Sequence, residues 1–227
     1  MKVIYVIQAR TNSTRLPAKV LLPINRLPIA VLAAKRASNL GVKTIVLTSK
    51  EKTDDYLCEI LENNGIAHYR GSLDNTLDRF VTALEGYEDD TIVVRLTADN
   101  VVPDGKFISS VVNFFIDSNV NYLSTTGDTT GLPYGLSAEV MYLSSLREAS
   151  INTTDSFDCE HVTPYIRRKY GDNRYNNLSN LNLAHLRCTI DTLDDYLYMA
   201  SVLHNVSDVI NESALNIMNI LNEKNNE

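Results

Sequence analysis

Short apolar runs alternate with segments of helical character along the whole chain. Residues 3–7, 44–48 and 91–96 are rich in valine, isoleucine and leucine, and such near-continuous runs are typical of strands buried on both faces. Weaker strand patterns occupy residues 67–70, 121–125, 135–142 and 187–190, and helix signals begin near Pro28, Thr53, Ser156 and Thr192. The helix that begins at Ser156 is expected to continue as far as Gly171. This alternation predicts an α/β fold, a single Rossmann-like domain whose mainly parallel, mixed sheet is flanked by helices.

The length and composition fit one domain. The chain has 227 residues, of which 44% are hydrophobic, so it can bury a full core. We expect the domain to span residues 1–221 and the Asn-rich tail over 222–227 to fray.

The charge balance and the cysteines narrow the possible partners and location. A formal net charge of -7 would repel nucleic acid and anionic membranes at long range, so neither is an expected partner. Cys58, Cys159 and Cys188 lie far apart and form no zinc-type pair, and no secretory signal or membrane-spanning run is evident. We therefore expect a reducing, cytoplasmic setting.

The first strand leads directly into a loop that is rich in hydrogen-bond donors. The carboxyl end of a strand in such a sheet is where these folds bind ligands. Three cations and four small polar residues fall within ten positions: Arg10, Thr11, Asn12, Ser13, Thr14, Arg15 and Lys19. A triphosphate would use all of these groups, whereas the alternative is a solvated basic turn. The loop lacks the glycines of a Walker A motif.

Two aspartates follow predicted strands. Asp99 comes after the run at 91–96, and Asp191 comes after the weaker run at 187–190. If both strands end at one edge of the sheet, the two carboxylates converge beside the cationic loop and suit Mg²⁺, which needs only one or two protein carboxylates plus substrate phosphates. The alternative for Asp191 is a helix cap, because aspartate is a preferred N-cap residue. Separately, Thr192 and Asp195 have the spacing of a capping box for the helix that follows.

Four blocks of the sequence resemble one known family. Gln8 to Leu21 is similar to the signature of the cytidylyltransferases of the spore coat polysaccharide (SpsF) type, which are relatives of acylneuraminate and keto-deoxy-octulosonate cytidylyltransferases. Residues 94–99, 160–168 and 186–192 resemble further blocks of that family in the same order. The chain departs from the family pattern at Asn12 and Ala18, where glycine is usual, at Asn100, where cysteine is common, and at Ser137, where aspartate is expected.

The resemblance implies an activity and a set of site residues. It implies a nucleotide-diphospho-sugar transferase-like fold and Mg²⁺-dependent transfer of CMP from CTP to a small acidic sugar for polysaccharide or glycan synthesis, in a possible homodimer. Arg15, Lys19 and Asp99 would be catalytic, and Asp99 and Asp191 would hold Mg²⁺. The nucleotide would be bound by Gln8, Ala9, Arg10, Thr11, Ser13, Thr48, Ser49, Arg70, Gly71 and Ser72. The acceptor would be bound by Ser137, Glu139 and His161.

The residues themselves also allow other readings. His161 can be a structural histidine, Ser137 a solvent-facing strand residue and residues 71–79 a plain turn with a helix cap. Other functions are a nucleotidyltransferase with another base or a polyol phosphate acceptor, a nucleotide-sugar-dependent glycosyltransferase, or an inactive homologue that only binds. A glycosyltransferase usually carries an Asp-x-Asp motif, but this chain has Asp99-Asn100-Val101 at that place.

Overall fold

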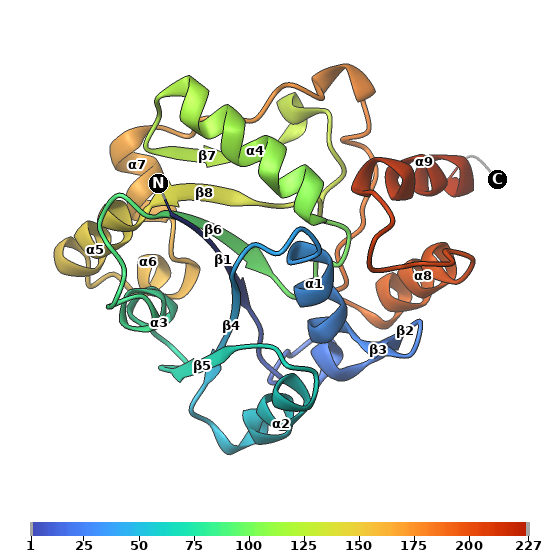
Figure 1. The fold of residues 1–227 in the computed structure, drawn as a ribbon, viewed down its shortest axis with the longest axis horizontal. Coiled ribbons are helices and arrows are strands. Elements are labelled where there is room, and N and C mark those ends of the chain that lie inside the picture. The colour runs from blue at the N-terminus through green and yellow to red at the C-terminus, as the bar shows by residue number, and fades with distance from the viewer. Residues whose placement is uncertain (1, 226–227) are drawn as a thin grey trace.

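The core of the fold is a six-stranded mixed sheet (Figure 1). The computed structural model describes residues 2–225. The strand order is β5-β4-β1-β6-β8-β7, in which β5, β4, β1 and β6 are parallel and β8 runs antiparallel to both of its neighbours. The strands are β1 (Val3–Gln8), β4 (Thr44–Ser49), β5 (His68–Gly71), β6 (Ile92–Thr97), β7 (Tyr122–Ser124) and β8 (Glu139–Tyr142). The predicted α/β class with a mainly parallel mixed sheet is therefore confirmed.

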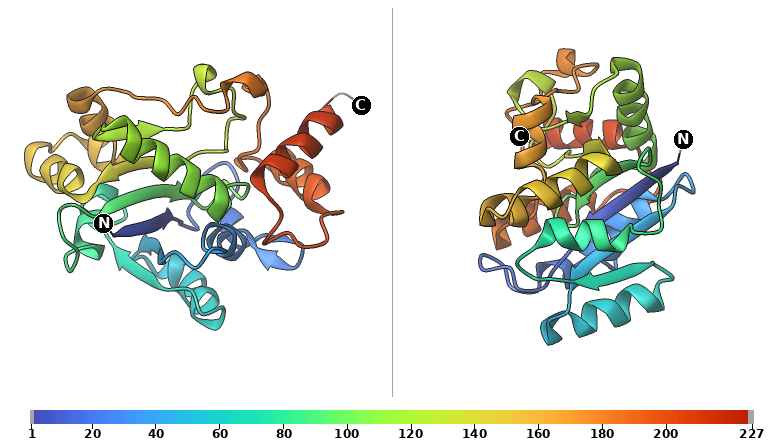
Figure 2. Two further views of the ribbon diagram at one scale, coloured as in Figure 1. Left: turned by 45° about the horizontal axis from the view of Figure 1, so that its top comes forward. Right: turned by 90° about the vertical axis from the view of Figure 1, so that its left-hand side faces the viewer.

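Helices cover both faces of the sheet. One core contains residues from α1 (Ile29–Ala37), α2 (Asp55–Asn63), α4 (Gly105–Ser118), α8 (Leu193–Leu203) and α9 (Ala214–Asn225). The core on the other face contains residues from α3 (Thr76–Ala83), α5 (Leu143–Asn152) and α7 (Pro164–Tyr170), and α6 (Ser156–His161) lies beside α3. The two further views in Figure 2 show α8 and α9 together at one end of the molecule, where Asn25, in the turn of the hairpin of β2 (Pro23–Ile24) and β3 (Leu27–Pro28), donates to Leu203 at the end of α8.

Alternate residues of the central strands enter the two cores. Tyr5 and Ile7 of β1 pack in the core of α1 and α4, whereas Ile4 and Val6 pack in the core of α3 and α5. Successive side chains of a strand point to opposite faces, so a strand that is covered on both sides must be apolar at nearly every position. This explains the uninterrupted apolar runs in the sequence.

Three sequence predictions differ from the structure. The single helix expected from Ser156 to Gly171 is two helices, α6 and α7, which are separated at Val162 and Thr163. Residues 187–190 are not a strand, since only an isolated bridge joins Arg187 to Tyr134. The tail expected to fray from 222 onward is part of α9 as far as Asn225, and residues 226–227 lie outside the described residues.

Within residues 2–225, no helix is both long enough and apolar enough to span a membrane.

Ala18 carries a local backbone cost that a glycine would remove. Its φ of 57° and ψ of 21° are left-handed, which costs an L-residue with a Cβ about 1–2 kcal/mol. Asn12, the other position where the family has glycine, is not among the described residues with positive φ. Glycine would remove the strain at Ala18, but it also has more freedom in the unfolded chain, which offsets part of the gain. We therefore predict that Ala18→Gly raises the free energy of unfolding by about 0.5–1 kcal/mol.

Urea denaturation measures this difference, and Ala37→Gly at the end of α1 is the matched control. Ala37 is helical and buried, so its change to glycine should destabilise the protein by roughly 0.5–1 kcal/mol or more. Equal destabilisation by both variants would contradict the strain at Ala18.

Candidate active site

The loop after β1 is fastened to the end of β4 by one buried carboxylate, Asp54. Its Oδ1 accepts hydrogen bonds from the backbone N–H (2.8 Å) and hydroxyl (2.6 Å) of Thr11, and its Oδ2 accepts from the backbone N–H (3.1 Å) and hydroxyl of Ser49. Burial alone would raise the pKa of Asp54, but the hydrogen bonds from Ser49 and Thr11 outweigh it and hold this pKa below its usual value. Asp54 therefore remains an anion inside the protein.

Lys19 is the centre of the site. Its ammonium lies 2.7 Å from Asp99 Oδ2, 3.0 Å from Asp191 Oδ1 and 2.8 Å from the carbonyl oxygen of Ile190. Its side chain is only 9% exposed. The structure thus brings together Lys19, Asp99 and Asp191, as the sequence predicted, although Asp191 is carried by an irregular segment rather than by a strand.

The segment that carries Asp191 is fixed from two directions. The backbone N–H of Ile190 donates to the carbonyl oxygen of Asp99 at 2.9 Å, and the side chain of Asp195 accepts from the backbone N–H groups of Asp191 and Thr192. The predicted capping box of Thr192 and Asp195 is present. The cap thus belongs to Thr192 and Asp195, which leaves the Asp191 carboxylate free to face the cations.

Three cations contact the Asp191 carboxylate. Arg15 lies 2.8 Å from Oδ1, next to Lys19, and Arg187 lies 2.7 Å from Oδ2. Burial would raise the pKa of Asp191, but Lys19, Arg15 and Arg187 together hold it below its usual value.

A cavity of about 240 Å³ opens beside these charges, and we call it the phosphate cavity. In the described part of the chain, the side chains of Asn12, Ser13 and Thr14 on its wall have no hydrogen-bond or charge partner. Arg10 lies 3.6 Å from Glu160 of α6. The residues that line the phosphate cavity are Gln8, Ala9, Arg10, Asn12, Ser13, Thr14, Arg15, Lys19, Val20, Thr97, Ala98, Asp99 and Asp191.

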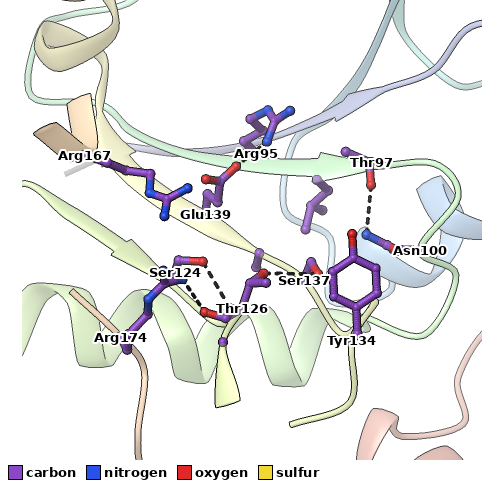
Figure 3. A pocket seen from close by; sticks show the side chains of 13 residues that line it. Arg95, Thr97, Asn100, Ser124, Thr126, Tyr134, Ser137, Glu139, Arg167 and Arg174 are labelled. Carbon is purple, nitrogen blue, oxygen red and sulfur yellow. Dashed lines mark hydrogen bonds and ion pairs between the residues drawn. The ribbon is translucent and has the colours of Figure 1, made fainter. Parts of the chain in front are cut away.

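A second cavity of about 290 Å³ adjoins the first, and Thr97 lines both. We call it the arginine cavity. Figure 3 shows Arg95, Arg167 and Glu139 toward one end and Tyr134, Asn100 and Thr97 toward the other. Arg174 and the predicted acceptor residue Ser137 also line it, and the Ser137 hydroxyl accepts from Thr126 at 3.3 Å.

Glu139 is held at the floor of the arginine cavity. Oε2 accepts from Arg95, and Oε1 accepts from the Tyr122 hydroxyl and from Thr163 at 2.7 Å. Burial would raise its pKa, but Arg95, Tyr122 and Thr163 hold it low. A carboxylate offers about four acceptor positions, so three donors leave room for one hydroxyl of a bound sugar.

A tight turn between α6 and α7 supplies the Thr163 hydroxyl. Val162 is buried and adopts φ 73° and ψ −51°, and the backbone N–H of Thr163 donates to the carbonyl oxygen of His161 at 2.8 Å. These features define a γ-turn of the rare, strained kind. His161 lies just before it, exposed and 4.3 Å from the Phe157 ring, in a third cavity that shares Arg95, Glu139 and Arg167 with the arginine cavity.

Most of the residues predicted to contact the nucleotide are buried or already make hydrogen bonds within the protein. Thr48 is fully buried, Ser49 and Thr11 donate to Asp54, and Ser72 accepts from the backbone N–H of Asn75. Gly71 lies where a Cβ would come within 2.7 Å of the Arg79 side chain. The hydroxyls of Thr11 and Ser49 both donate to Asp54, so neither hydroxyl hydrogen is available to a nucleotide in this structure. The broader role of these residues as a nucleoside wall stays a prediction.

Arg70 is also engaged. Its Nε donates to the carbonyl oxygen of Ser49 at 2.9 Å, and its Nη2 lies 2.7 Å from Asp55. The guanidinium thus ties β5 to the start of α2.

Several site residues were missed by sequence reasoning. Arg95 could have been found, since it is a lone charge within an apolar strand beside the strand end. Arg167 lies in the last turn of α7, where a cation complements the helix dipole, so its position in the sequence does not show that it faces a cavity. Asp54, Thr163 and Arg174 carried no local signal, because their roles depend on contacts with segments distant in the chain.

The donor set beside Lys19 fits a hard cation. Two carboxylate oxygens and one carbonyl oxygen already surround an ammonium, and oxygen ligands are those that Mg²⁺ prefers. Within residues 2–225, no group of three or more His, Cys, Asp or Glu side chains forms a closed metal site. A metal held by Asp99 and Asp191 would have to take its remaining ligands from substrate and water.

Lys19, Asp99 and Asp191 meet at the carboxyl edge of the parallel strands, which is where open α/β sheets bind ligands. A family model described as Cytidylyltransferase matches residues 4–214, so the chain belongs to the cytidylyltransferase family. The spore coat polysaccharide biosynthesis protein SpsF of Bacillus subtilis is 30% identical over 97% of this chain and 94% of its own length. An uncharacterized protein of Methanocaldococcus jannaschii is 34% identical over 98% of this chain and 91% of its own length.

Solved structures agree with this fold. A cytidylyltransferase from Leptospira borgpetersenii superposes with a TM-score of 0.89 at 29% identity, over 100% of this chain and 96% of that chain. CMP:2-keto-3-deoxy-manno-octonic acid synthetase complexed with CTP superposes with a TM-score of 0.67 at 15% identity, over 90% of this chain and 99% of the synthetase chain. The second likeness is one of fold alone.

The Asp54 anchor predicts a pH-dependent loss of stability. Asp54→Asn turns one acceptor oxygen into a donor that faces two other donors, so we expect the free energy of unfolding to fall by about 2–4 kcal/mol at pH 7. Because the folded pKa of Asp54 is depressed, its contribution is complete above the unfolded value of about 3.9 and is lost as the pH falls through the folded pKa. The difference between parent and variant should therefore narrow below about pH 4.

Denaturant unfolding from pH 3 to pH 7 measures this difference, with Asp55→Asn as the control. Asp55 is exposed and pairs with Arg70, so its loss should cost less than about 1 kcal/mol. A difference between parent and Asp54→Asn that stays constant across this range would contradict an ionised Asp54.

Proposed function

We propose that the protein transfers CMP from CTP to an acidic sugar and releases pyrophosphate. The observation that carries the proposal is that the phosphate cavity and the arginine cavity meet at Thr97. The cationic loop can hold a triphosphate on one side of this junction, and an acceptor can approach the α-phosphate from the other.

The charge of the arginine cavity supports an anionic acceptor. Three guanidinium groups and one carboxylate line it. Asp172 engages Nε and Nη2 of Arg167 at 3.0 and 2.8 Å, which leaves Nη1 without a partner in the described part of the chain. A carboxylate on the acceptor would pair with a guanidinium held in this way.

Each group in the phosphate cavity has a part in the transfer. Arg15 and Lys19 would attract the β and γ phosphates, and Ser13 and Thr14 would donate to phosphate oxygens. An acceptor hydroxyl oxygen attacks the α-phosphorus, the bond to the bridging oxygen of pyrophosphate breaks, and the hydroxyl proton is released to water. The cations stabilise the charge that develops on the leaving group.

Asp99 and Asp191 would hold Mg²⁺. When bound, the ion supplies charge neutralisation at the phosphates and orients the reacting groups. SpsF and the synthetase described above lend support, since their names place them in polysaccharide synthesis and in CMP transfer to an acidic sugar. Family membership favours this reaction over the glycosyltransferase alternative.

Pyrophosphate release with each of the four nucleoside triphosphates and a panel of acidic sugars tests the proposal. We expect turnover with CTP and an acidic sugar, and a loss of about a hundredfold or more in Asp99→Asn because a metal ligand charge is gone. Asp117→Asn, an exposed change on α4, should act like the parent. Turnover with GTP as fast as with CTP, or with neutral sugars only, would contradict the proposal.

Arg167→Met tests the site of the acceptor charge. The change keeps the unbranched stem but removes the guanidinium, so we expect the KM for the acceptor to rise about tenfold or more while the KM for CTP stays within about twofold. Steady-state kinetics with each substrate varied in turn measures the two Michaelis constants separately.

Arg147→Met is the matched control, since Arg147 pairs with Asp89 and none of the three cavities includes it. Equal effects of Arg167→Met on both Michaelis constants would place Arg167 away from the acceptor. Ser137 stays a prediction for acceptor choice.

A further inference from the structure

The loop cations of the phosphate cavity are already paired with carboxylates of the protein itself. Lys19 is shared by Asp99 and Asp191, Arg15 contacts Asp191, and Arg10 lies near Glu160. Without a ligand, the cavity is therefore close to neutral. Neither an anion nor a cation can use these groups fully until an existing ion pair opens.

Lys19 stands where a metal would stand. The oxygens nearest to its ammonium are Asp99 Oδ2, Asp191 Oδ1 and the carbonyl oxygen of Ile190, the hard donor type that Mg²⁺ requires. These oxygens cannot surround an ammonium and a dication at the same time, and two cations at such close range repel one another. The metal and the Lys19 ammonium must therefore exclude each other from this position.

A polyphosphate provides another partner for Lys19. The loop that carries Lys19 lines the same cavity as the unpartnered side chains of Ser13 and Thr14, so a bound triphosphate would lie within reach of the ammonium. Once Lys19 turns toward the phosphates, Asp99 Oδ2 loses its cation and Asp191 Oδ1 keeps only Arg15, a second cation that the phosphates would also attract.

We propose that Lys19 acts as an internal counter-ion that keeps the metal site closed until a triphosphate draws it away. Metal and triphosphate then bind with positive coupling, and this coupling is reciprocal: each ligand raises the affinity for the other by the same factor. A nucleoside monophosphate, which has no β or γ phosphate, does not open the site. This inference rests on the proposed function only in taking a triphosphate as the ligand.

Binding of Mn²⁺, measured by electron paramagnetic resonance of the free ion without any nucleotide, tests the proposal. The parent protein should bind Mn²⁺ weakly, and Lys19→Met should bind it at least about tenfold more tightly because the competing cation is gone. Lys19→Arg keeps the positive charge and should remain weak. Lys106→Met, which removes an exposed lysine outside the three cavities, should bind as the parent does.

Two further measurements locate the effect and guard against misfolding. Circular dichroism confirms that each variant is folded, and Asp191→Asn added to Lys19→Met should remove the gained affinity. Water-proton relaxation with Mn²⁺ should show a ternary complex of the parent with CTP but none with CMP.

Two results would overturn the proposal. One is Mn²⁺ binding by the nucleotide-free parent that is as tight as binding by Lys19→Met, and the other is a failure of both proteins to bind. Neither result bears on whether CTP is turned over, so the failure of this inference is distinct from a failure of the proposed function.

Discussion

The contact between Lys19 and the two aspartates is the interaction on which the site depends. It joins three distant parts of the chain: the loop after β1, the end of β6 and the segment before α8. A buried ammonium is costly unless it is paired and hydrogen-bonded, and here three oxygens meet that need. Because the proposed metal ligands and the proposed phosphate-binding cation are partners of one another, the site can keep its geometry before any substrate arrives.

Two further carboxylates, Asp54 and Glu139, accept hydrogen bonds that hold the rest of the site in place. Asp54 fastens Thr11 to Ser49 on the side of β4, and the γ-turn at Val162 presents Thr163 to Glu139 on the side of β8. Both place a carboxylate where hydrogen bonds keep it ionised. The phosphate cavity and the arginine cavity thus lie along one sheet edge between two rigid anchors, a form of preorganisation that favours ordered placement of two substrates.

The sequence predicted the parts of the fold that depend on local pattern. β1, β4 and β6 are apolar at almost every position because both faces of the sheet are covered, and that pattern is visible without a structure. Residues 187–190 have a weaker strand pattern and pair with no strand, and only an isolated bridge at Arg187 remains. The break between α6 and α7 had a signal in the sequence, because Pro164 at the start of α7 cannot donate the backbone hydrogen bond that a continuous helix needs. The positive φ of Val162 had no such signal.

In the site, too, local pattern predicts some residues, whereas others depend on contacts between distant segments. Asp99 could be predicted, because it follows β6 and the carboxyl ends of parallel strands converge at one edge of the sheet. The place of Asp191 was predicted from a strand that does not form, and a backbone hydrogen bond from Ile190 to Asp99 brings it there instead. The engagement of Thr11 and Ser49 by Asp54 could not be predicted, since the sequence shows three polar residues but not which of them face one another. Arg174 reaches the arginine cavity from a segment that has no regular structure, so neither strand nor helix periodicity could place it.

The most direct test is a crystal structure with CTP and Mn²⁺, with the metal located by anomalous scattering. The account predicts one Mn²⁺ contacted by both Asp99 and Asp191, with the Lys19 ammonium moved from between them onto a β or γ phosphate oxygen. A metal bound elsewhere, with Lys19 still between the two aspartates, would contradict it.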